Sequence, residues 1–310
     1  MSEPLLSVAV VVGALRDRAQ RVVRAVAEQD VAADLELLIL DLERDREPIE
    51  IPAPLRARHI ALPGGTISHA KGEAVRRASA PAVAFLEDHC YPRPGWARAL
   101  IEAHRGPWAA VGYAFENANP DRWFSRSAMV SDYGVFVDPE RGVADFISGN
   151  NVSYKCHALL AFGDRLDGLL MVDYNVHLAL RARGERLFIE PRALAAHENY
   201  TRMSDLGNAN RSYCRAMAAN RARGWGRRRR LFYAVATPVA APAIKFVRLA
   251  RSVAARPRAA LPTLSALPVI IAAYAWSAAG EARGYLDHSA DAAEADFLVW
   301  ELATERAGRT

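Results

Sequence analysis

The sequence is poor in lysine and cysteine. Only Lys71, Lys155 and Lys245 are lysines among 40 basic residues, so arginine carries nearly all the positive charge. Arginine suits bidentate recognition of phosphate and carboxylate, but a compositional bias of the genome is the simpler explanation of the excess and the one that we favour. The three cysteines form no CxxC pair. This argues against a disulfide scaffold or a zinc knuckle and for a reducing compartment.

Several common site motifs are also missing. The chain contains no GxSxG, HExxH, GxxxxGK[ST] or GxGxxG segment, which argues against the hydrolase, zincin, P-loop and dinucleotide sites that these motifs build. No basic residue precedes the first apolar run, so we expect a strand there and no signal peptide. The net charge of +5 is modest, and no recognised motif accompanies the arginines at 227–230, so we expect no nucleic-acid partner.

The first half of the chain alternates apolar runs with segments of helical spacing. The apolar runs do not alternate with polar residues, which is typical of strands in a parallel sheet that is covered on both faces. We therefore expect an α/β fold with a mostly parallel sheet. The expected strands are 7–12, 35–40 and 82–86, and the expected helices are 18–29, 69–79 and 96–104.

Acids follow two of the expected strands. Asp41 ends the second apolar run, and Glu87, Asp88 and His89 follow the third. In such sheets ligands bind at the carboxyl ends of strands. Carboxylates at the end of a buried strand need a cation or hydrogen bonds to compensate them. The cluster therefore predicts a site for a positive group, with solvent-exposed loop acids as the alternative.

Two further candidates lie in the middle of the chain. A helix is expected at about 166–183, where Asp173 and His177 share a face. Gly184 follows basic residues, as at many helix ends. A strand-like segment then ends at His197. His177 is interpreted as a supporting or core residue.

The composition changes after about residue 206. Arginine is concentrated around Trp225 and Phe232, and residues 259–280 contain no charge. The length of this run fits a bilayer span, but Pro262 and Pro268 weaken that interpretation. Basic residues beside apolar helices favour a lipid-contacting region on the cytoplasmic side of the cell membrane. An ordinary buried helical hairpin is the alternative.

The order of these features resembles the family 2 glycosyltransferases of the membrane-associated bacterial type, over about residues 5–200. The resemblance implies a GT-A (Rossmann-like) catalytic domain at 1–205 and a helical membrane-associated region at 206–310. The segments that carry it are "LELLILDLERD", "AFLEDH" with "PRPGW", "ISGNNVSYK", "MVDYNVHLALRARG" and "RLFIEPRALAAH".

The resemblance also assigns roles to the metal candidates. The acidic motif of the family binds a divalent ion that stabilises the leaving diphosphate of a nucleotide sugar. By position, Asp88 would bind Mn²⁺ or Mg²⁺ together with His89 and His197, and Glu87 would hold the nucleotide or sugar. The imidazole of His89 favours Mn²⁺ over Mg²⁺. A structural histidine is the alternative for His197.

The remaining roles concern the two substrates. Asp173 matches the general base that deprotonates the acceptor hydroxyl for inversion at the anomeric carbon. Lys71 would neutralise phosphate, and Asp41 would contact the base or ribose. The alternatives are a surface acid for Asp173 and a surface charge for Lys71.

The sequence thus predicts a metal-dependent hexosyltransferase. Its acceptor would be a saccharide or a polyprenyl-linked hydroxyl in cell-envelope polysaccharide biosynthesis. Two segments depart from the family pattern, "VVGALRDR" after the first strand and "DLER" after the second. These departures leave a second hypothesis open, a non-catalytic GT-A relative that binds a saccharide or nucleotide or acts as a scaffold.

Overall fold

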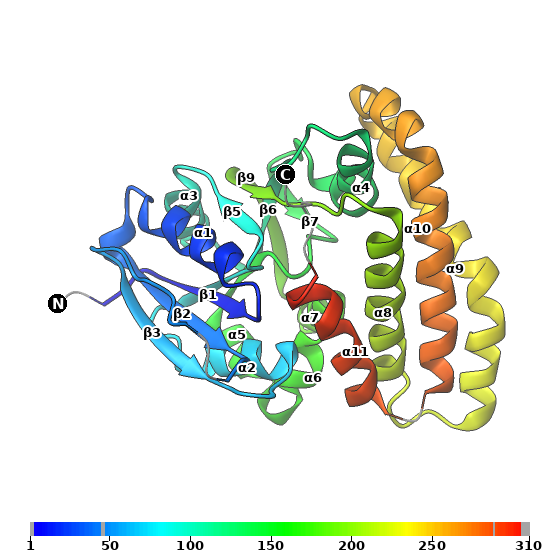
Figure 1. Ribbon diagram of the computed structural model, residues 1–310, viewed down its shortest axis with the longest axis horizontal. Helices are drawn as coiled ribbons and strands as arrows, with labels where there is room; N and C mark the ends of the chain where they lie inside the picture. The colour runs from blue at the N-terminus through cyan, green and yellow to red at the C-terminus, as the bar shows by residue number, and fades with distance from the viewer. Residues whose placement is uncertain (1–2, 45–46, 288, 305–310) are drawn as a thin grey trace. The chain divides into compact units, whose positions relative to one another are not determined.

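The computed structural model describes residues 3–44, 47–287 and 289–304. The chain divides into two compact units (Figure 1). The first comprises Met1–Ala118 and Phe136–His197, and the second comprises Asn119–Val135 and Glu198–Thr310. Residues 119–135 therefore group with the C-terminal helices, which no pattern in the sequence indicated.

The first unit is built around a nine-stranded sheet in the order β3-β2-β1-β4-β8-β6-β9-β5, with β7 paired to β9. The strands are β1 (Leu6–Val12), β2 (Leu35–Asp41), β3 (Arg56–Ala61), β4 (Ala82–Leu86), β5 (Cys90–Pro92), β6 (Trp108–Asn117), β7 (Gly142–Ala144), β8 (Val152–Lys155) and β9 (Arg186–His197).

Helices flank this sheet. They are α1 (Arg16–Ala27), α2 (Ile67–Arg77), α3 (Trp96–His104), α5 (Cys156–Leu160), α6 (Leu166–Leu170) and α7 (Asp173–Ala182), with 3-10 turns η1 (Ala32–Asp34), η2 (Gly134–Phe136) and η3 (Gly163–Arg165).

The predicted α/β class is confirmed, but the sheet is mixed and not mostly parallel. The strands β3, β2, β1 and β4 are parallel, and their central members are buried along their whole length, as the continuous apolar runs predicted. Beyond β4, β8 is antiparallel to both β4 and β6. The short or polar strands β3, β5, β7 and β8 carry too little apolar pattern to be recognised in the sequence.

The expected helix at 166–183 is two helices. Val172 is extended, with φ −137° and ψ 102°, so α6 ends before it and α7 begins at Asp173. Asp173 and His177 still share a face. The break places the Asp173 carboxylate at a helix N-terminus, where the helix dipole favours negative charge.

The second unit is helical. It contains α4 (Trp123–Tyr133), α8 (Met203–Arg221), α9 (Arg227–Ala255), the 3-10 turn η4 (Pro257–Ala259), α10 (Ala260–Leu286) and α11 (Ala290–Leu302). Its core lies where α4, α8 and α10 meet, around Leu206, Val269 and Ala273. By length and composition α9 and α10 could each cross a membrane.

Candidate active site

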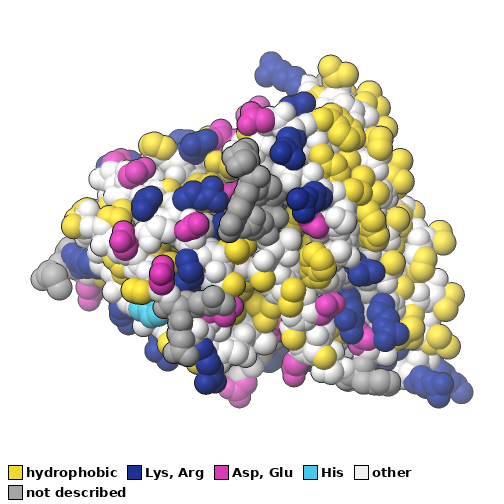
Figure 2. Space-filling view, viewed as in Figure 1, with side chains coloured by type: hydrophobic (Ala, Val, Ile, Leu, Met, Phe, Trp, Pro, Cys, Tyr) yellow, Lys and Arg dark blue, Asp and Glu magenta, His cyan; other side chains and the backbone are white. Residues whose placement is uncertain are grey.

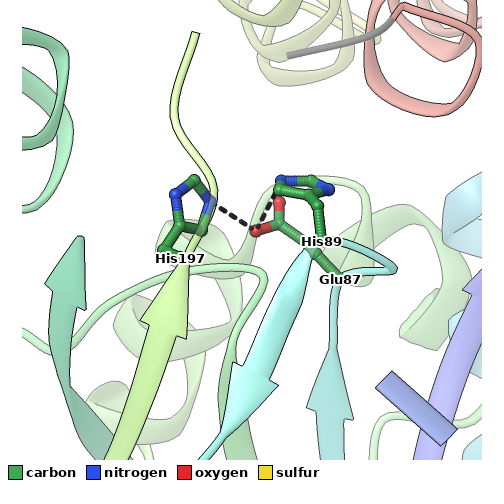
Figure 3. Close-up of side chains that lie close together, drawn as sticks. All are labelled: Glu87, His89 and His197. Carbon is green, nitrogen blue, oxygen red and sulfur yellow. Dashed lines mark ion pairs between the residues drawn. The ribbon is translucent and has the colours of Figure 1, made fainter. Parts of the chain in front are cut away.

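Glu87, His89 and His197 lie together beyond the strand ends of the first unit (Figure 3). One ligand atom from each lies within 4.8 Å of the other two. The Glu87 carboxylate oxygen Oε2 is 3.3 Å from His197 Nε2 and 3.6 Å from His89 Nε2. The two imidazole rings meet edge to face, 4.8 Å between centroids.

Strand pairing brings these residues together across a long stretch of sequence. The short strand β5 runs antiparallel to the end of β9, with Cys90 opposite His197. His89, just before β5, is thereby placed beside His197. Asn151 fixes Glu87 from the other side, because its amide nitrogen donates to the Glu87 carboxylate and its amide oxygen accepts from the Glu87 backbone N–H.

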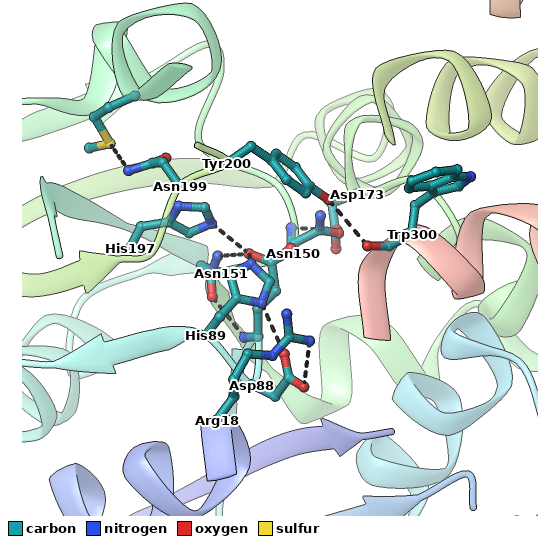
Figure 4. A network of polar contacts seen from close by, with 12 residues as sticks. Arg18, Asp88, His89, Asn150, Asn151, Asp173, His197, Asn199, Tyr200 and Trp300 are labelled. Atoms are coloured by element: carbon teal, nitrogen blue, oxygen red, sulfur yellow. Dashed lines mark hydrogen bonds and ion pairs between the residues drawn. The ribbon is translucent and has the colours of Figure 1, made fainter. Parts of the chain in front are cut away.

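Asp88 lies outside this group of three, although the sequence predicted it as the metal ligand. Its carboxylate is fully buried and forms an ion pair with Arg18, 2.9 Å from Nη2 to Oδ2 (Figure 4). Its other oxygen, Oδ1, lies 2.9 Å from His89 Nδ1. Consecutive residues after a strand point in different directions, so Glu87 faces the Nε2 atoms of both histidines, whereas Asp88 contacts only Nδ1 of His89.

The three side chains have the right chemistry for a divalent ion. One carboxylate and two imidazoles suit Mn²⁺, Fe²⁺ or Zn²⁺ better than Mg²⁺. With Nδ1–H of His89 donating to Asp88, Nε2 of the same ring keeps its lone pair on the side of Glu87. A metal-binding histidine oriented by a carboxylate in this way is a recurrent arrangement. Asp88 therefore fits as the residue that orients a ligand.

Asp173 forms a second polar group in the same unit (Figure 4). Its Oδ2 accepts from the Lys71 ammonium at 3.0 Å and from the Asn150 backbone N–H at 2.7 Å. Its other oxygen, Oδ1, accepts a longer hydrogen bond, 3.3 Å, from the Tyr154 hydroxyl. The Asp173 side chain is fully buried in this arrangement, so it is no surface acid. Lys71 is no surface charge either, because it is buried beside Asp173.

The loop Gly149–Asn150–Asn151 connects the two groups. Asn151 holds Glu87, whereas Asn150 touches Asp173 and Lys71. Asn150 has a φ of +62°, a conformation that asparagine tolerates better than most residues. A Cβ atom at position 149 would lie 3.3 Å from the Cβ of Asp173, so glycine permits this close approach.

His177 is a supporting residue, as the sequence suggested. Its Nε2 lies 2.9 Å from the Tyr154 hydroxyl, the same hydroxyl that contacts Asp173. Burial lowers the pKa of His177 to about 4, even though the neighbouring Asp173 acts in the opposite direction. The imidazole is therefore neutral at physiological pH.

Asp41 belongs to a third group, at the end of β2. Its carboxylate receives two hydrogen bonds from Arg16, at 3.0 and 2.6 Å, and one from His59 at 3.0 Å. Burial alone would raise the pKa of Asp41, but these bonds and the Glu43 N–H outweigh it, so its pKa is lowered. The Arg16 guanidinium thus already compensates the carboxylate that was predicted to contact a nucleotide.

Sequence reasoning missed Arg18, and it quoted Asn150, Asn151 and Tyr154 only as part of a family segment. Tyr154 lies within the short strand β8 and Asn151 immediately before it, and both are buried and polar. A buried polar side chain usually has a partner, but the sequence offers no means of telling which one. Arg18 lies in α1, whose other buried residues, Ala19, Val22, Val23 and Val26, are all apolar, so the helical spacing did not single it out.

No protein-family model matches the sequence, and no curated protein matches it either. Among solved structures, the chain is similar to the mannosyltransferase PcManGT from Pyrobaculum calidifontis in complex with GDP-Man and Mn²⁺, at 14% identity over 89% of this chain and 88% of that chain, with a TM-score of 0.49.

Two further solved structures are similar. S. aureus TarS 1–349 in complex with UDP has 14% identity over 70% of this chain and 65% of that chain, with a TM-score of 0.49. GalNAc-T7 with UDP, GalNAc and Mn²⁺ has 12% identity over 63% of this chain, with a TM-score of 0.47. The match spans only 43% of the GalNAc-T7 chain. These similarities do not assign the chain to any of these enzymes. The functional conclusion therefore rests on the residues of the site.

Proposed function

We propose that the protein is a metal-dependent, inverting glycosyltransferase of the GT-A type that moves a sugar from a nucleotide-sugar donor to a hydroxyl group. The observation that carries this proposal is the loop Gly149–Asn150–Asn151. It joins a carboxylate–imidazole cluster suited to a divalent ion to a buried carboxylate suited to accept a proton. Transfer from a nucleotide sugar needs both groups.

The roles follow from the contacts. A bound divalent ion supplies positive charge that stabilises the leaving diphosphate. Glu87, His89 and His197 would hold it, and Asp88 orients His89. Asp173 accepts the proton of the acceptor hydroxyl, whose oxygen attacks the anomeric carbon. The bond from that carbon to the diphosphate oxygen breaks, and the configuration inverts.

The two carboxylate oxygens of Asp173 have different tasks. Lys71 and the Asn150 N–H hold Oδ2, whereas Oδ1 has only the long contact with Tyr154. A carboxylate oxygen can accept more than one hydrogen bond, so Oδ1 is the atom that accepts the proton. Because the side chain is fully buried, acceptor binding has to displace the atoms that cover it.

The proposed acceptor is a saccharide or a lipid-linked hydroxyl, and the proposed place of work is the cytoplasmic face of the cell membrane. The support is the pair of long apolar helices α9 and α10 with their flanking arginines.

A non-catalytic saccharide- or nucleotide-binding protein is the second candidate. The contacts of Asp41 favour this second candidate. Arg16 and His59 already form hydrogen bonds with the Asp41 carboxylate, which stands at the position that the family uses to contact the nucleotide.

The deciding experiment measures donor binding and hydrolysis. A panel of UDP- and GDP-sugars is tested with Mn²⁺, Mg²⁺, Zn²⁺ or a chelator, on wild type, Glu87→Gln and Asp173→Asn. We expect one donor to bind only with metal, Glu87→Gln to lose that binding, and Asp173→Asn to keep it without turnover. The matched controls are the exposed acids Glu140→Gln and Asp164→Asn. Metal-independent nucleotide binding without turnover in wild type supports the binding protein instead.

A further inference from the structure

The helices α9 and α10 carry a strongly one-sided charge. Residues 227–280 contain nine basic and no acidic residues, although the whole chain has a net charge of only +5. The remainder of the chain is therefore net negative. Arg227 and Arg228 are exposed, and no acid in the described residues pairs with either one. The charges are concentrated at the two ends of α9, at Arg227–Arg230 and at Arg248 and Arg251.

Between these charges, α9 exposes apolar side chains to solvent. Phe232, Val235 and Val239 are 68%, 71% and 77% exposed. Figure 2 shows hydrophobic side chains gathered along α9 and α10, with basic side chains at the ends. We call this surface the α9 face. It comprises Leu231, Phe232, Val235, Val239, Ile244 and Val247 of α9 and Leu261 and Leu264 of α10. Soluble proteins seldom leave so continuous an apolar surface without a partner.

The helix α9 is a poor membrane span. Its charge-free stretch, 231–244, has 14 residues and is about 21 Å long, whereas a bilayer core is about 30 Å thick. It also contains Pro238 and Pro242.

The helix α10 is long enough to span a bilayer, but one side of it packs directly against α8. A Cβ atom on Gly280 would lie 2.1 Å from the Arg211 carbonyl oxygen, and one on Gly284 would lie 2.2 Å from that of Arg215. Such close backbone contact leaves no room for lipid. The Ser277 hydroxyl donates to Asn210, and Arg221 forms an ion pair with Glu281. These polar contacts are typical of a helix packed inside a soluble domain.

We propose that the second unit binds flat on an anionic lipid bilayer through the α9 face, with neither α9 nor α10 crossing it. An in-plane helix with an apolar face and flanking arginines has the chemistry of an interfacial membrane anchor. Charge complementarity selects anionic headgroups, because this segment offers no acid to repel them. The inference deepens the membrane part of the proposed function by naming the surface and the lipid.

The test uses vesicle co-sedimentation with the full chain, without donor or metal. We expect binding to vesicles of phosphatidylcholine with about 30 mol% phosphatidylglycerol to be at least about tenfold stronger than to phosphatidylcholine alone. About 0.5 M NaCl should weaken it, because salt screens the arginines. Extraction with alkaline carbonate should release the protein. Retention in the carbonate pellet would show a spanning helix and overturn the proposal.

Two variants test the surface itself. Phe232→Asp combined with Val239→Asp should reduce vesicle binding at least about tenfold, because charges then enter the apolar face. The matched control is Val299→Asp, an exposed valine on α11, which should bind as wild type does. Arg227→Glu with Arg228→Glu should remove the preference for anionic vesicles. The control pair for these changes is Arg24→Glu with Arg105→Glu, both exposed in the first unit.

Two further results would overturn the proposal. One is wild-type binding by the aspartate variant. The other is no vesicle binding but a dimer in solution that Phe232→Asp disrupts, because the α9 face is then a contact between copies of the chain. Glycosyl transfer is not part of the readout, so failure of the proposed reaction does not affect this test.

Discussion

The two polar groups joined by the Gly149–Asn150–Asn151 loop compensate their carboxylates in different ways. Asp173 has a protein cation, Lys71, at 3.0 Å, and both side chains are buried. The Glu87 carboxylate lies beside two imidazoles and accepts a hydrogen bond from the Asn151 amide. The Asp173 carboxylate is therefore compensated by a protein cation, whereas the Glu87 carboxylate belongs to the cluster in which the proposed divalent ion would bind.

The largest expected effect is on the free energy of unfolding, and it concerns the ion pair between Lys71 and Asp173. Lys71→Met leaves the buried Asp173 carboxylate without its cation, and breaking a buried ion pair in this way costs about 3–5 kcal/mol. Urea denaturation measures this loss. The control is Lys155→Met, because Lys155 donates to the Gly106 carbonyl oxygen and pairs with no carboxylate among the described residues. If both variants lose the same free energy of unfolding, Lys71 does not stabilise the protein by compensating the charge of Asp173.

The next largest effect concerns turnover. Asp173→Asn should lower kcat about 10³-fold, the usual contribution of a general base, while the amide oxygen still accepts from Lys71 and Asn150. Donor affinity should change little, since the donor contacts proposed here do not include Asp173. Single-turnover kinetics measures both quantities. A variant that keeps wild-type kcat would remove Asp173 from the mechanism.

The variant Asp88→Asn tests the cluster of Glu87, His89 and His197. The neutral amide can no longer hold the His89 ring as the carboxylate does, and loss of such an orienting partner lowers metal affinity about 10- to 100-fold. Mn²⁺ titration followed by electron paramagnetic resonance measures the affinity. His89→Ala should bind more weakly still, because it removes a ligand, and the exposed His157→Ala should bind normally. If Asp88→Asn and His89→Ala lose the same amount, Asp88 is itself a ligand.

The smallest effect is a pH dependence of stability. The pKa of His177 is about 4 when folded, below the usual value of 6.5. The unfolded chain therefore binds more protons between these values, and stability falls as the pH drops from 6.5 towards 4. His177 should contribute a loss of about 2 kcal/mol at about pH 5.

Urea denaturation of wild type and His177→Gln at about pH 7.5 and pH 5 isolates this contribution. The glutamine variant should lose less stability on acidification, because its side chain does not titrate. The same acid-induced loss in both proteins would assign the pH dependence to other groups.

Local patterns predicted part of this fold well. The strands β1, β2 and β4 and the helix α3 were recognised because continuous apolar runs and helical spacing are local properties. The strands β3, β5 and β8 were not, because pairing with distant segments creates them. The same limit explains the site. The acids after β4 were recognised by their position. A sequence does not show where consecutive side chains point, so it could not indicate that Glu87 lies with His89 and His197 while Asp88 pairs with Arg18.

By itself, the sequence determined the α/β class, the position of charged residues at strand ends and the basic, apolar character of the C-terminal helices, since all of these depend on neighbouring residues. Only the tertiary structure decided that His89 and His197 meet through the pairing of β5 with β9, and that Lys71 lies against Asp173. It also decided that α10 packs against α8 and leaves α9 exposed. These contacts join residues far apart in the chain, and their geometry is set by the packing of the whole unit.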